Sequence, residues 1–182
     1  MKYFPKISRG NIYLSPVNPD DYEIFTKWMN DSRIADNITM WSKIIGLWWE
    51  RQWLENLQKT WDYILAIIKK DDDKLLWTVW LHWIDHINQT AELWISIWDF
   101  DEHNKWYWAD AINAALLYAF NTLNLYNIYL NVKSFNKKAI ACYRKVWFKE
   151  IWTRHHCQYC NWEWYDLISM EILKPDWQEK NK

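Results

Sequence analysis

Hydrophobic and polar positions in the first third of the chain predict one strand and two helices. Residues 11–17 (NIYLSPV) are rich in strand-forming side chains and predict a first strand. Residues 18–21 (NPDD) predict a helix start, because a capping side chain, an early proline and acids suit the positive end of a helix dipole. This helix is predicted to end near Met29. Residues 33–48 have no clear period and predict a loop or short helical turns, and residues 50–59 predict a second helix.

The middle of the chain changes to strand patterns. Residues 63–68 (YILAII) form a continuous apolar run, which is typical of a strand buried on both faces. A polar turn at residues 71–74 and a return strand at 75–84 predict a hairpin. Residues 90–98 predict a further strand, and residues 99–105 predict a charged loop.

The last third mixes helix and strand patterns. Residues 109–123 are rich in Ala and carry an apolar face, which predicts a helix. Residues 126–132 alternate as a strand does, and residues 134–145 predict a helix capped by Ser134 or Asn136.

Two closing strands are predicted at residues 148–153 and 163–173, on either side of a loop at 155–161. The polar tail from residue 175 is expected to fray. Since the chain has neither repeats nor a linker, we expect one α/β domain over residues 1–182, with a core at about 10–173.

Charge and composition exclude several classes of function. The 182 residues carry a formal net charge of -1, which argues against a nucleic-acid partner bound through its phosphates. No apolar run approaches the ~18 residues of a membrane span, so a membrane partner is not expected. Three cysteines are an odd number in a chain long enough to fold without disulfides, which favours a reducing, cytoplasmic location.

The balance of tryptophan and glycine is abnormal. The chain has 18 Trp and 2 Gly, whereas average usage of ~7% predicts roughly 13 Gly. Turns need positive φ angles, which Gly adopts at the least steric cost. The chain must therefore use Asn and Asp at its turns, strain these turn residues, or differ from the polypeptide that evolved.

Residues 91–93 (AEL) open a predicted strand, and residues 103–109 (HNKWYWA) lead into a predicted helix. These two motifs resemble the acetyl-CoA-binding segment of the GNAT family of N-acetyltransferases. Residues 123–148 and 27–31 resemble the branch that acetylates ribosomal-protein N-termini and spermidine. The resemblance implies an α/β (α+β) acyl-CoA N-acyltransferase fold, with a central, mostly antiparallel mixed sheet and helices on both faces.

The departure from the family pattern is systematic. The family's phosphate loop reads Arg/Gln-x-x-Gly-x-Gly/Ala, and here His103 takes the first position and Trp106 and Trp108 the glycine positions. In all, ten tryptophans stand where the family leads us to expect glycine, at positions 77, 80, 83, 94, 98, 106, 108, 147, 152 and 162. Indoles at 106 and 108 are expected to obstruct a phosphate cradle, because a Cβ already blocks close backbone approach.

The resemblance implies acetyl-CoA as acetyl donor, with its pyrophosphate at the free N–H groups of a helix start. Three sets of residues are expected to bind it. The phosphate set is His103, Asn104, Lys105, Trp106, Tyr107, Trp108 and Ala109. The pantetheine set is Ile95, Ser96 and Ile97, through backbone groups. Asn131 at a splay between strands, together with Asn136 and Lys138, completes the contacts.

Tyr143 and Glu92 are the expected catalytic residues. A phenol with a pKa near ~10 can protonate the leaving thiolate, and the family has a tyrosine at the position of Tyr143. Glu92 opens the central strand, where the family often carries a glutamate as base for the amine. The alternatives are a core tyrosine with its hydroxyl bonded to backbone and a charged strand end.

The acceptor stays open at this stage. A protein N-terminus, a polyamine and an aminoglycoside all stay open as acceptors. The resemblance implies that residues 18–60 and 154–163 build the acceptor site, and these ranges match the family most loosely. A non-catalytic domain that keeps the fold and acts as a binding module is the competing hypothesis, supported by Trp106 and Trp108. The oligomeric state is open too, with a homodimer as one alternative.

A cysteine and histidine cluster at residues 155–160 (HHCQYC) has the residue types of half a zinc site. Four ligands within six residues are cramped, and the chain lacks a second such pair. We therefore expect no metal.

We hypothesise that the surplus of tryptophan arises because the gene was translated with the wrong meaning of one codon. UGA is read as Trp in some genetic codes and as Gly in others. Sequencing the gene tests it. We expect UGA at codons 106, 108 and 147 and UGG at codons 28, 53 and 164. UGG at all six would leave substitution or drift as the explanation.

Overall fold

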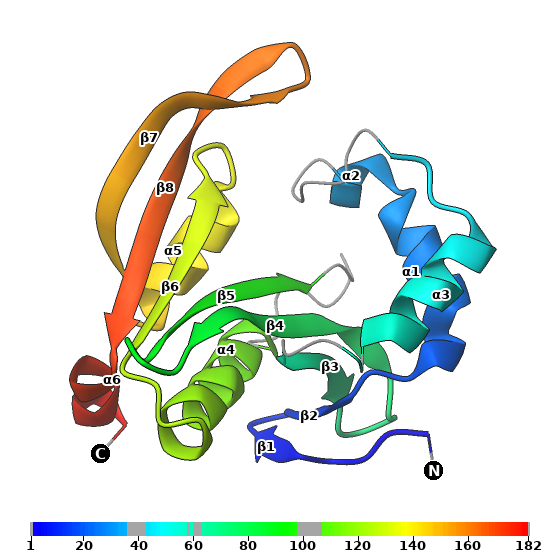
Figure 1. Cartoon of the computed structure of the whole chain (residues 1–182), viewed down its shortest axis with the longest axis horizontal. Coiled ribbons are helices and arrows are strands. Elements are labelled where there is room, and N and C mark those ends of the chain that lie inside the picture. The colour runs from blue at the N-terminus through cyan, green and yellow to red at the C-terminus, as the bar shows by residue number, and fades with distance from the viewer. Residues whose placement is uncertain (1, 36–42, 58, 60–62, 98–106, 182) are drawn as a thin grey trace.

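The computed structural model describes residues 2–35, 43–57, 59, 63–97 and 107–181. These residues form an eight-stranded sheet in the order β1-β2-β3-β4-β5-β6-β8-β7 (Figure 1). The strands are β1 Ile7–Arg9, β2 Ile12–Pro16, β3 Tyr63–Lys69, β4 Leu75–Asp85, β5 Thr90–Ile97, β6 Asn127–Lys133, β7 Lys149–Cys160 and β8 Glu163–Leu173. The helices are η1 Pro19–Asp21, α1 Tyr22–Met29, α2 Ser32–Ala35, α3 Leu47–Leu57, α4 Tyr107–Leu117, the π-helical η3 Tyr118–Thr122, α5 Lys137–Lys145 and α6 Lys174–Lys180.

Strand direction follows the expected mixed pattern. All neighbours in the sheet pair antiparallel except β5 and β6, which run parallel. A parallel pair needs a crossover connection, and here α4 and η3 supply it.

Alternating side chains divide the core into two layers. On β2, Ile12 and Leu14 join a large cluster with α4 and α5, whereas Tyr13 between them joins a smaller cluster with α1 and α3. Strand β3 contributes to both, since Ala66, Ile67 and Ile68 are all fully buried. The prediction of helices on both faces and of a strand buried on both faces is therefore confirmed.

Predicted helix starts agree with the structure where a cap was recognised. The Asn18 side chain accepts from the Asp20 amide at the start of η1. Asn136, and not Ser134, caps α5 by accepting from the Ala139 amide.

The helix predicted over residues 109–123 begins at Tyr107 among the described residues and changes to π-helical geometry at Tyr118. Its first turn is tied to the β1–β2 turn, because the Asp110 carboxylate accepts the Asn11 amide at 3.1 Å. Gly10 leaves room for this contact, since a Cβ there would lie 2.0 Å from the Asp110 carboxylate.

The prediction of a loop at residues 155–161 is wrong. Strand β7 continues to Cys160 and pairs with β8 up to the tip, where Cys160 lies opposite Glu163. Sequence patterning missed this because a register shift between Arg154 and Gln158 interrupts the alternation. Together β7 and β8 project as a long arm beyond the rest of the sheet (Figure 1).

Two further elements were not predicted. The polar tail forms helix α6 instead of fraying, because Trp177 is buried against Phe120 with ring centroids 5.4 Å apart. The Lys149 ammonium also contacts the Asp176 carboxylate at 2.6 Å. The short edge strand β1 was missed, since three residues carry too little pattern. No helix in the described part of the chain has the length and apolarity to cross a bilayer.

Three tryptophans adopt the left-handed backbone region that favours glycine. Their φ angles are 47° at Trp83, 67° at Trp147 and 66° at Trp162. All three belong to the ten positions where the family pattern leads us to expect glycine. For a bulky side chain this region is a real outlier.

Each of the three sits in a local motif that calls for glycine. Trp147 follows α5 in a Schellman motif, in which the Phe148 amide bonds the Tyr143 carbonyl and the Trp147 amide bonds the Arg144 carbonyl. Trp162 and Asn161, both with positive φ, form a two-residue hairpin turn of the kind that prefers Asn-Gly. Trp83 lies in the β4 bulge between His82 and Asp85.

Replacing Trp162 with glycine should therefore stabilise the protein. Trp162 is 90% exposed, so little packing is lost, and relief of the left-handed conformation is worth about 1 kcal/mol. The control is Trp164→Gly in the same hairpin, which is 60% exposed on strand β8 and should lose about 0.5–1 kcal/mol. Urea unfolding measures both, and a loss of stability in Trp162→Gly would contradict the assignment of strain.

Candidate active site

The centre of the sheet opens between β5 and β6. Their parallel pairing covers three positions, from Thr90 opposite Asn127 to Glu92 opposite Tyr129. Beyond these positions β5 stays paired with β4 as far as Ile97, and β6 stays paired with β8 as far as Lys133. The two strands therefore splay apart, as expected from the sequence, and the backbone of β5 is left unpaired on its β6 side over the described residues.

Glu92 lies at the last paired position before the splay. Its carboxylate is buried, with 2% of the residue exposed. Oε1 accepts a hydrogen bond from Asn131 Nδ2 at 2.7 Å, whereas Oε2 has no partner among the described residues. Burial raises the pKa of the neighbouring Tyr129 phenol, and the charge of the Glu92 carboxylate raises it further.

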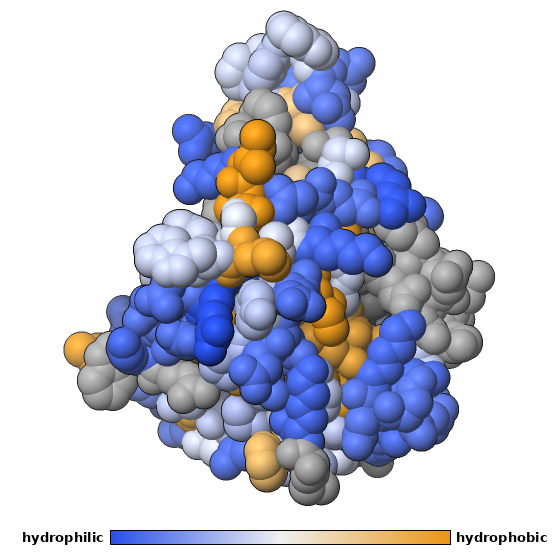
Figure 2. Space-filling view, turned by 90° about the vertical axis from the view of Figure 1, so that its right-hand side faces the viewer, coloured by the Kyte–Doolittle hydropathy of each residue, from blue (hydrophilic) through white to orange (hydrophobic). Residues whose placement is uncertain are grey.

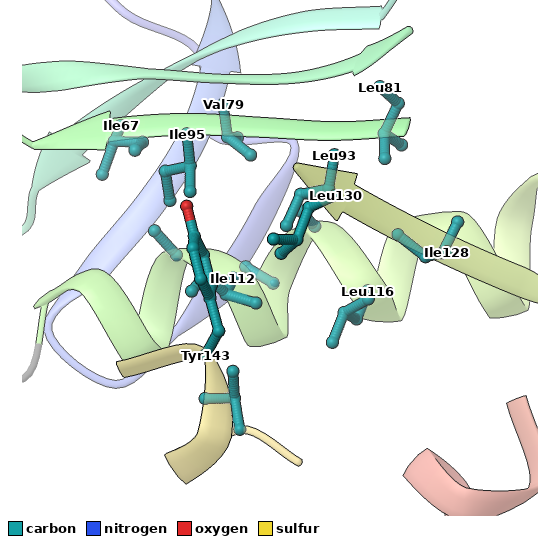
Figure 3. Close-up of a cluster of buried hydrophobic side chains, with 14 of the residues drawn as sticks. Ile67, Val79, Leu81, Leu93, Ile95, Ile112, Leu116, Ile128, Leu130 and Tyr143 are labelled. Carbon is teal, nitrogen blue, oxygen red and sulfur yellow. The ribbon is translucent and has the colours of Figure 1, made fainter. Parts of the chain in front are cut away.

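Tyr143 lies on α5 in the large core cluster. Its ring packs against Phe148 and Trp108, with centroids 5.9 Å and 6.1 Å away. In Figure 3 the side chain points toward the sheet, with its hydroxyl toward Ile95 of β5. Burial raises the pKa of Tyr143, so the phenol keeps its proton at neutral pH.

Glu92 and Tyr143 lie on opposite faces of the sheet. On β5, Ala91, Leu93 and Ile95 point into the cluster that contains α4 and Tyr143. Glu92 alternates with them and points to the other face, as strand geometry requires. The splay lies between the two side chains, so a reacting group at the splay could meet a carboxylate on one face and a phenol on the other.

The residues expected to bind the cofactor phosphates are described only in part. His103, Asn104, Lys105 and Trp106 lie outside the described residues. Tyr107 and Trp108 form the first turn of α4, and Ala109 follows. The Trp108 indole packs edge-on against Tyr143, and its Nε1 is buried without a hydrogen-bond partner among the described residues. An unsatisfied buried N–H costs about 1–3 kcal/mol, so the indole fits this place poorly.

The other expected cofactor contacts are dispersed. Ile95 is buried on β5, and the backbones of Ser96 and Ile97 continue that strand to its end. Asn136 caps α5, and Lys138 is exposed on its first turn. Asn131 lies on the face of Glu92, where it also accepts from Ser169 Oγ at 2.5 Å.

Cys142 and the histidines of the 155–160 cluster have defined local environments. Burial raises the pKa of the Cys142 thiol to about 11, which disfavours a thiolate. His155 and His156 are engaged by Asp166, through Nδ1 at 3.2 Å and the backbone amide at 2.9 Å. The residues that the structure describes contain no cluster of three or more potential metal ligands.

Glu50 on α3 is a buried acid that the sequence did not single out. It is fully buried, and neither carboxylate oxygen has a partner among the described residues. Burial raises its pKa from the ordinary 4.5 to about 7. An acid in a first helical turn looks like an ordinary dipole partner, and only the packing of α3 distinguishes it. The face near α1–α3 is mostly hydrophilic, broken by a narrow hydrophobic run (Figure 2).

Comparison with known proteins connects this geometry to a family. The model of the acetyltransferase (GNAT) domain matches residues 11–149. A spermidine N(1)-acetyltransferase of Escherichia coli is 32% identical over 99 residues, 54% of this chain and 53% of that protein. The chain therefore matches about half the length of that relative. A spermidine N(1)-acetyltransferase of Vibrio cholerae is 27% identical over 161 residues, 84% of this chain and 92% of that protein.

Solved structures share the fold. A Vibrio cholerae spermidine N-acetyltransferase in complex with CoA and spermine has a TM-score of 0.81 at 23% identity, covering 92% of this chain and 98% of that one. A GNAT-family acetyltransferase of Bacillus anthracis has a TM-score of 0.79 at 18% identity, covering 93% and 98%. The fold predicted from the motifs between residues 90 and 148 is confirmed.

Glu50 makes stability depend on pH. The folded protein favours the neutral acid, so stability should fall as pH rises from about 4.5 through about 7. At pH 8 Glu50→Gln should be more stable than the wild type by up to about 3 kcal/mol, and at pH 4 the two should be nearly equal. Glu55→Gln, an exposed acid on the same helix, is the matched control. Parallel stability curves for the wild type and Glu50→Gln in urea would refute this.

Proposed function

The chain belongs to the GNAT acetyltransferase family, and we propose that it transfers an acetyl group from acetyl-CoA directly to a primary amine. The observation that carries this proposal is the splay between β5 and β6, with Glu92 on one face of the sheet and Tyr143 on the other. Direct transfer needs a base on the side where the amine enters and an acid on the side where the thiol leaves. The two side chains have the chemistry for these two tasks.

Glu92 acts as the base in this mechanism. The acceptor amine arrives as an ammonium ion and must lose a proton before its nitrogen can attack the thioester carbonyl. The partnerless Oε2 of Glu92 can take that proton, directly or through water. The new C–N bond then forms as the carbonyl becomes tetrahedral.

Tyr143 acts as the acid. When the tetrahedral intermediate collapses, the C–S bond breaks and the sulfur of coenzyme A leaves as a thiolate. A phenol carries its proton at neutral pH and can donate it to this sulfur. Cys142, whose pKa burial raises to about 11, takes no part, so no acyl-enzyme forms.

The donor would bind along the splay and at the start of α4. The unpaired backbone of β5 toward Ile97 offers hydrogen-bonding groups to an extended pantetheine arm, and the first turn of α4 offers N–H groups to phosphate. Trp108 opposes this binding in the chain as it stands, since its indole lies between α4 and Tyr143. This obstruction is the observation behind the alternative of a non-catalytic binding module, which the spermidine acetyltransferase relatives do not favour.

A polyamine is the first candidate acceptor, and a protein N-terminus is the second. The relatives of this chain that carry a substrate in their names are spermidine acetyltransferases. A buried carboxylate on the acceptor face suits a cationic amine. None of the three cysteines forms a disulfide in the described part of the chain, which supports a reducing, cytoplasmic location.

Thiol release from acetyl-CoA with a panel of amines tests the proposal. We expect release with spermidine or another primary amine, and Tyr143→Phe should lower kcat by about 100-fold, because a general acid contributes at least that much. The KM for acetyl-CoA should change less than twofold. The double variant Trp106→Gly with Trp108→Gly should bind acetyl-CoA more tightly in isothermal titration.

Three outcomes of this experiment contradict the proposal in different ways. Unchanged turnover in Tyr143→Phe would remove Tyr143 from the mechanism. Equal acetyl-CoA affinity in both proteins would contradict the obstruction by the indoles. If both proteins bind acetyl-CoA but neither releases thiol with any amine, the binding module is the better description.

A further inference from the structure

A chain of hydrogen bonds between side chains crosses three adjacent strands at the splay. Ser169 of β8 donates from Oγ to Asn131 Oδ1 of β6 at 2.5 Å. Asn131 donates from Nδ2 to Glu92 Oε1 of β5 at 2.7 Å. Asn131 and Ser169 lie directly opposite each other in the β6–β8 ladder, which fixes one end of the chain.

These two hydrogen bonds are consistent with only one orientation of the Asn131 amide. A carboxylate oxygen only accepts, so the amide must turn its NH2 group toward Glu92. Its carbonyl oxygen then faces Ser169, whose hydroxyl is free to donate. Ser169 and the carboxylate therefore hold the amide from both ends.

The arrangement also separates the two oxygens of Glu92. Oε1 is occupied by Asn131, whereas Oε2 is buried without a partner among the described residues. A purely structural carboxylate at this depth would be expected to have both oxygens satisfied, because an unpaired buried acceptor is costly. The hydrogen bond from Asn131 thus fixes the carboxylate and leaves one oxygen available for a proton.

We propose that Asn131 and Ser169 are positioning residues, which aim the free oxygen of Glu92 at the acceptor amine. This inference rests on the proposed function, in which Glu92 is the base. Neither side chain touches the reacting atoms in this role. Asn131 holds Glu92, and Ser169 holds Asn131.

The titratable side chains directly opposite Glu92 lie on the two neighbouring strands, β4 and β6. His82 of β4 lies opposite Glu92 in the ladder. Tyr129 of β6 lies opposite Glu92 on the other side, and Glu171 of β8 lies opposite Tyr129. Since all of these remain in place when Asn131 is changed, a shift in the titration of Glu92 reports the loss of the amide.

The chain offers a matched control on the same strand. Asn127 Nδ2 donates to Glu171 Oε2 at 2.8 Å, an Asn–Glu hydrogen bond between β6 and β8 that does not touch Glu92. Asn127→Ala and Asn131→Ala therefore remove the same kind of bond from the same strand. Thermal melting establishes that each variant is folded.

The test compares pH profiles of kcat/KM with spermidine. Asn131→Ala should lower kcat/KM about 10-fold or more. It should also move the acid limb up by about one pH unit, because the ionised carboxylate loses a donor. Ser169→Ala should shift the limb in the same direction by less, and Ser169→Thr, which keeps the hydroxyl, should restore it. Asn127→Ala should leave the limb in place.

A second readout does not depend on activity. The carboxyl carbon of Glu92, assigned in a ¹³C NMR titration by its loss in Glu92→Gln, should titrate at higher pH in Asn131→Ala than in the wild type. Coinciding midpoints, or an equal shift in Asn127→Ala, would overturn the positioning role. If neither the wild type nor the double variant Trp106→Gly with Trp108→Gly releases thiol with any amine, the proposed function fails, while the titration still decides whether Asn131 and Glu92 are coupled.

Discussion

The interrupted pairing of β5 and β6 is the constraint on which the rest of the structure depends. Two parallel strands in the middle of a sheet normally pair along their length, and here they pair over three positions only. Each strand keeps its other neighbour, so the sheet stays intact around the gap. Glu92 and Tyr143 lie on opposite faces of the sheet at this gap, and the Asn131 side chain bridges the strands next to the point where backbone pairing stops.

Backbone strain at Trp147 and Trp162 is held in place by the surrounding structure. Trp147 keeps a left-handed conformation because the Schellman bonds to the Arg144 and Tyr143 carbonyls leave the chain no other path out of α5. Trp162 keeps one because the β7 and β8 ladder closes around a two-residue turn. Such residues persist only where neighbouring structure over-determines them. These motifs require a left-handed backbone conformation at the two positions and do not require a bulky side chain there.

Local signals predicted most of the elements, and non-local ones explain the misses. The Asn18 and Asn136 caps and the apolar run at residues 63–68 were read correctly, because each depends on neighbours within a few residues. Helix α6 was missed because its stability comes from Trp177 packing on Phe120, 57 positions earlier. The continuation of β7 was missed because its bulge disturbs the alternation that pairing with β8 would otherwise produce.

The sequence by itself determined most of the strands and helices in their order, the family resemblance, and Glu92 and Tyr143 as the residues to examine. Only the tertiary structure decided that these two side chains lie on opposite faces of one gap, that the Glu92 carboxylate is held on one oxygen, and that Asn131 and Ser169 hold it. The physical reason is separation along the chain. Glu92 and Asn131 are 39 positions apart, and Asn131 and Ser169 are 38 apart, so sheet pairing alone brings them together.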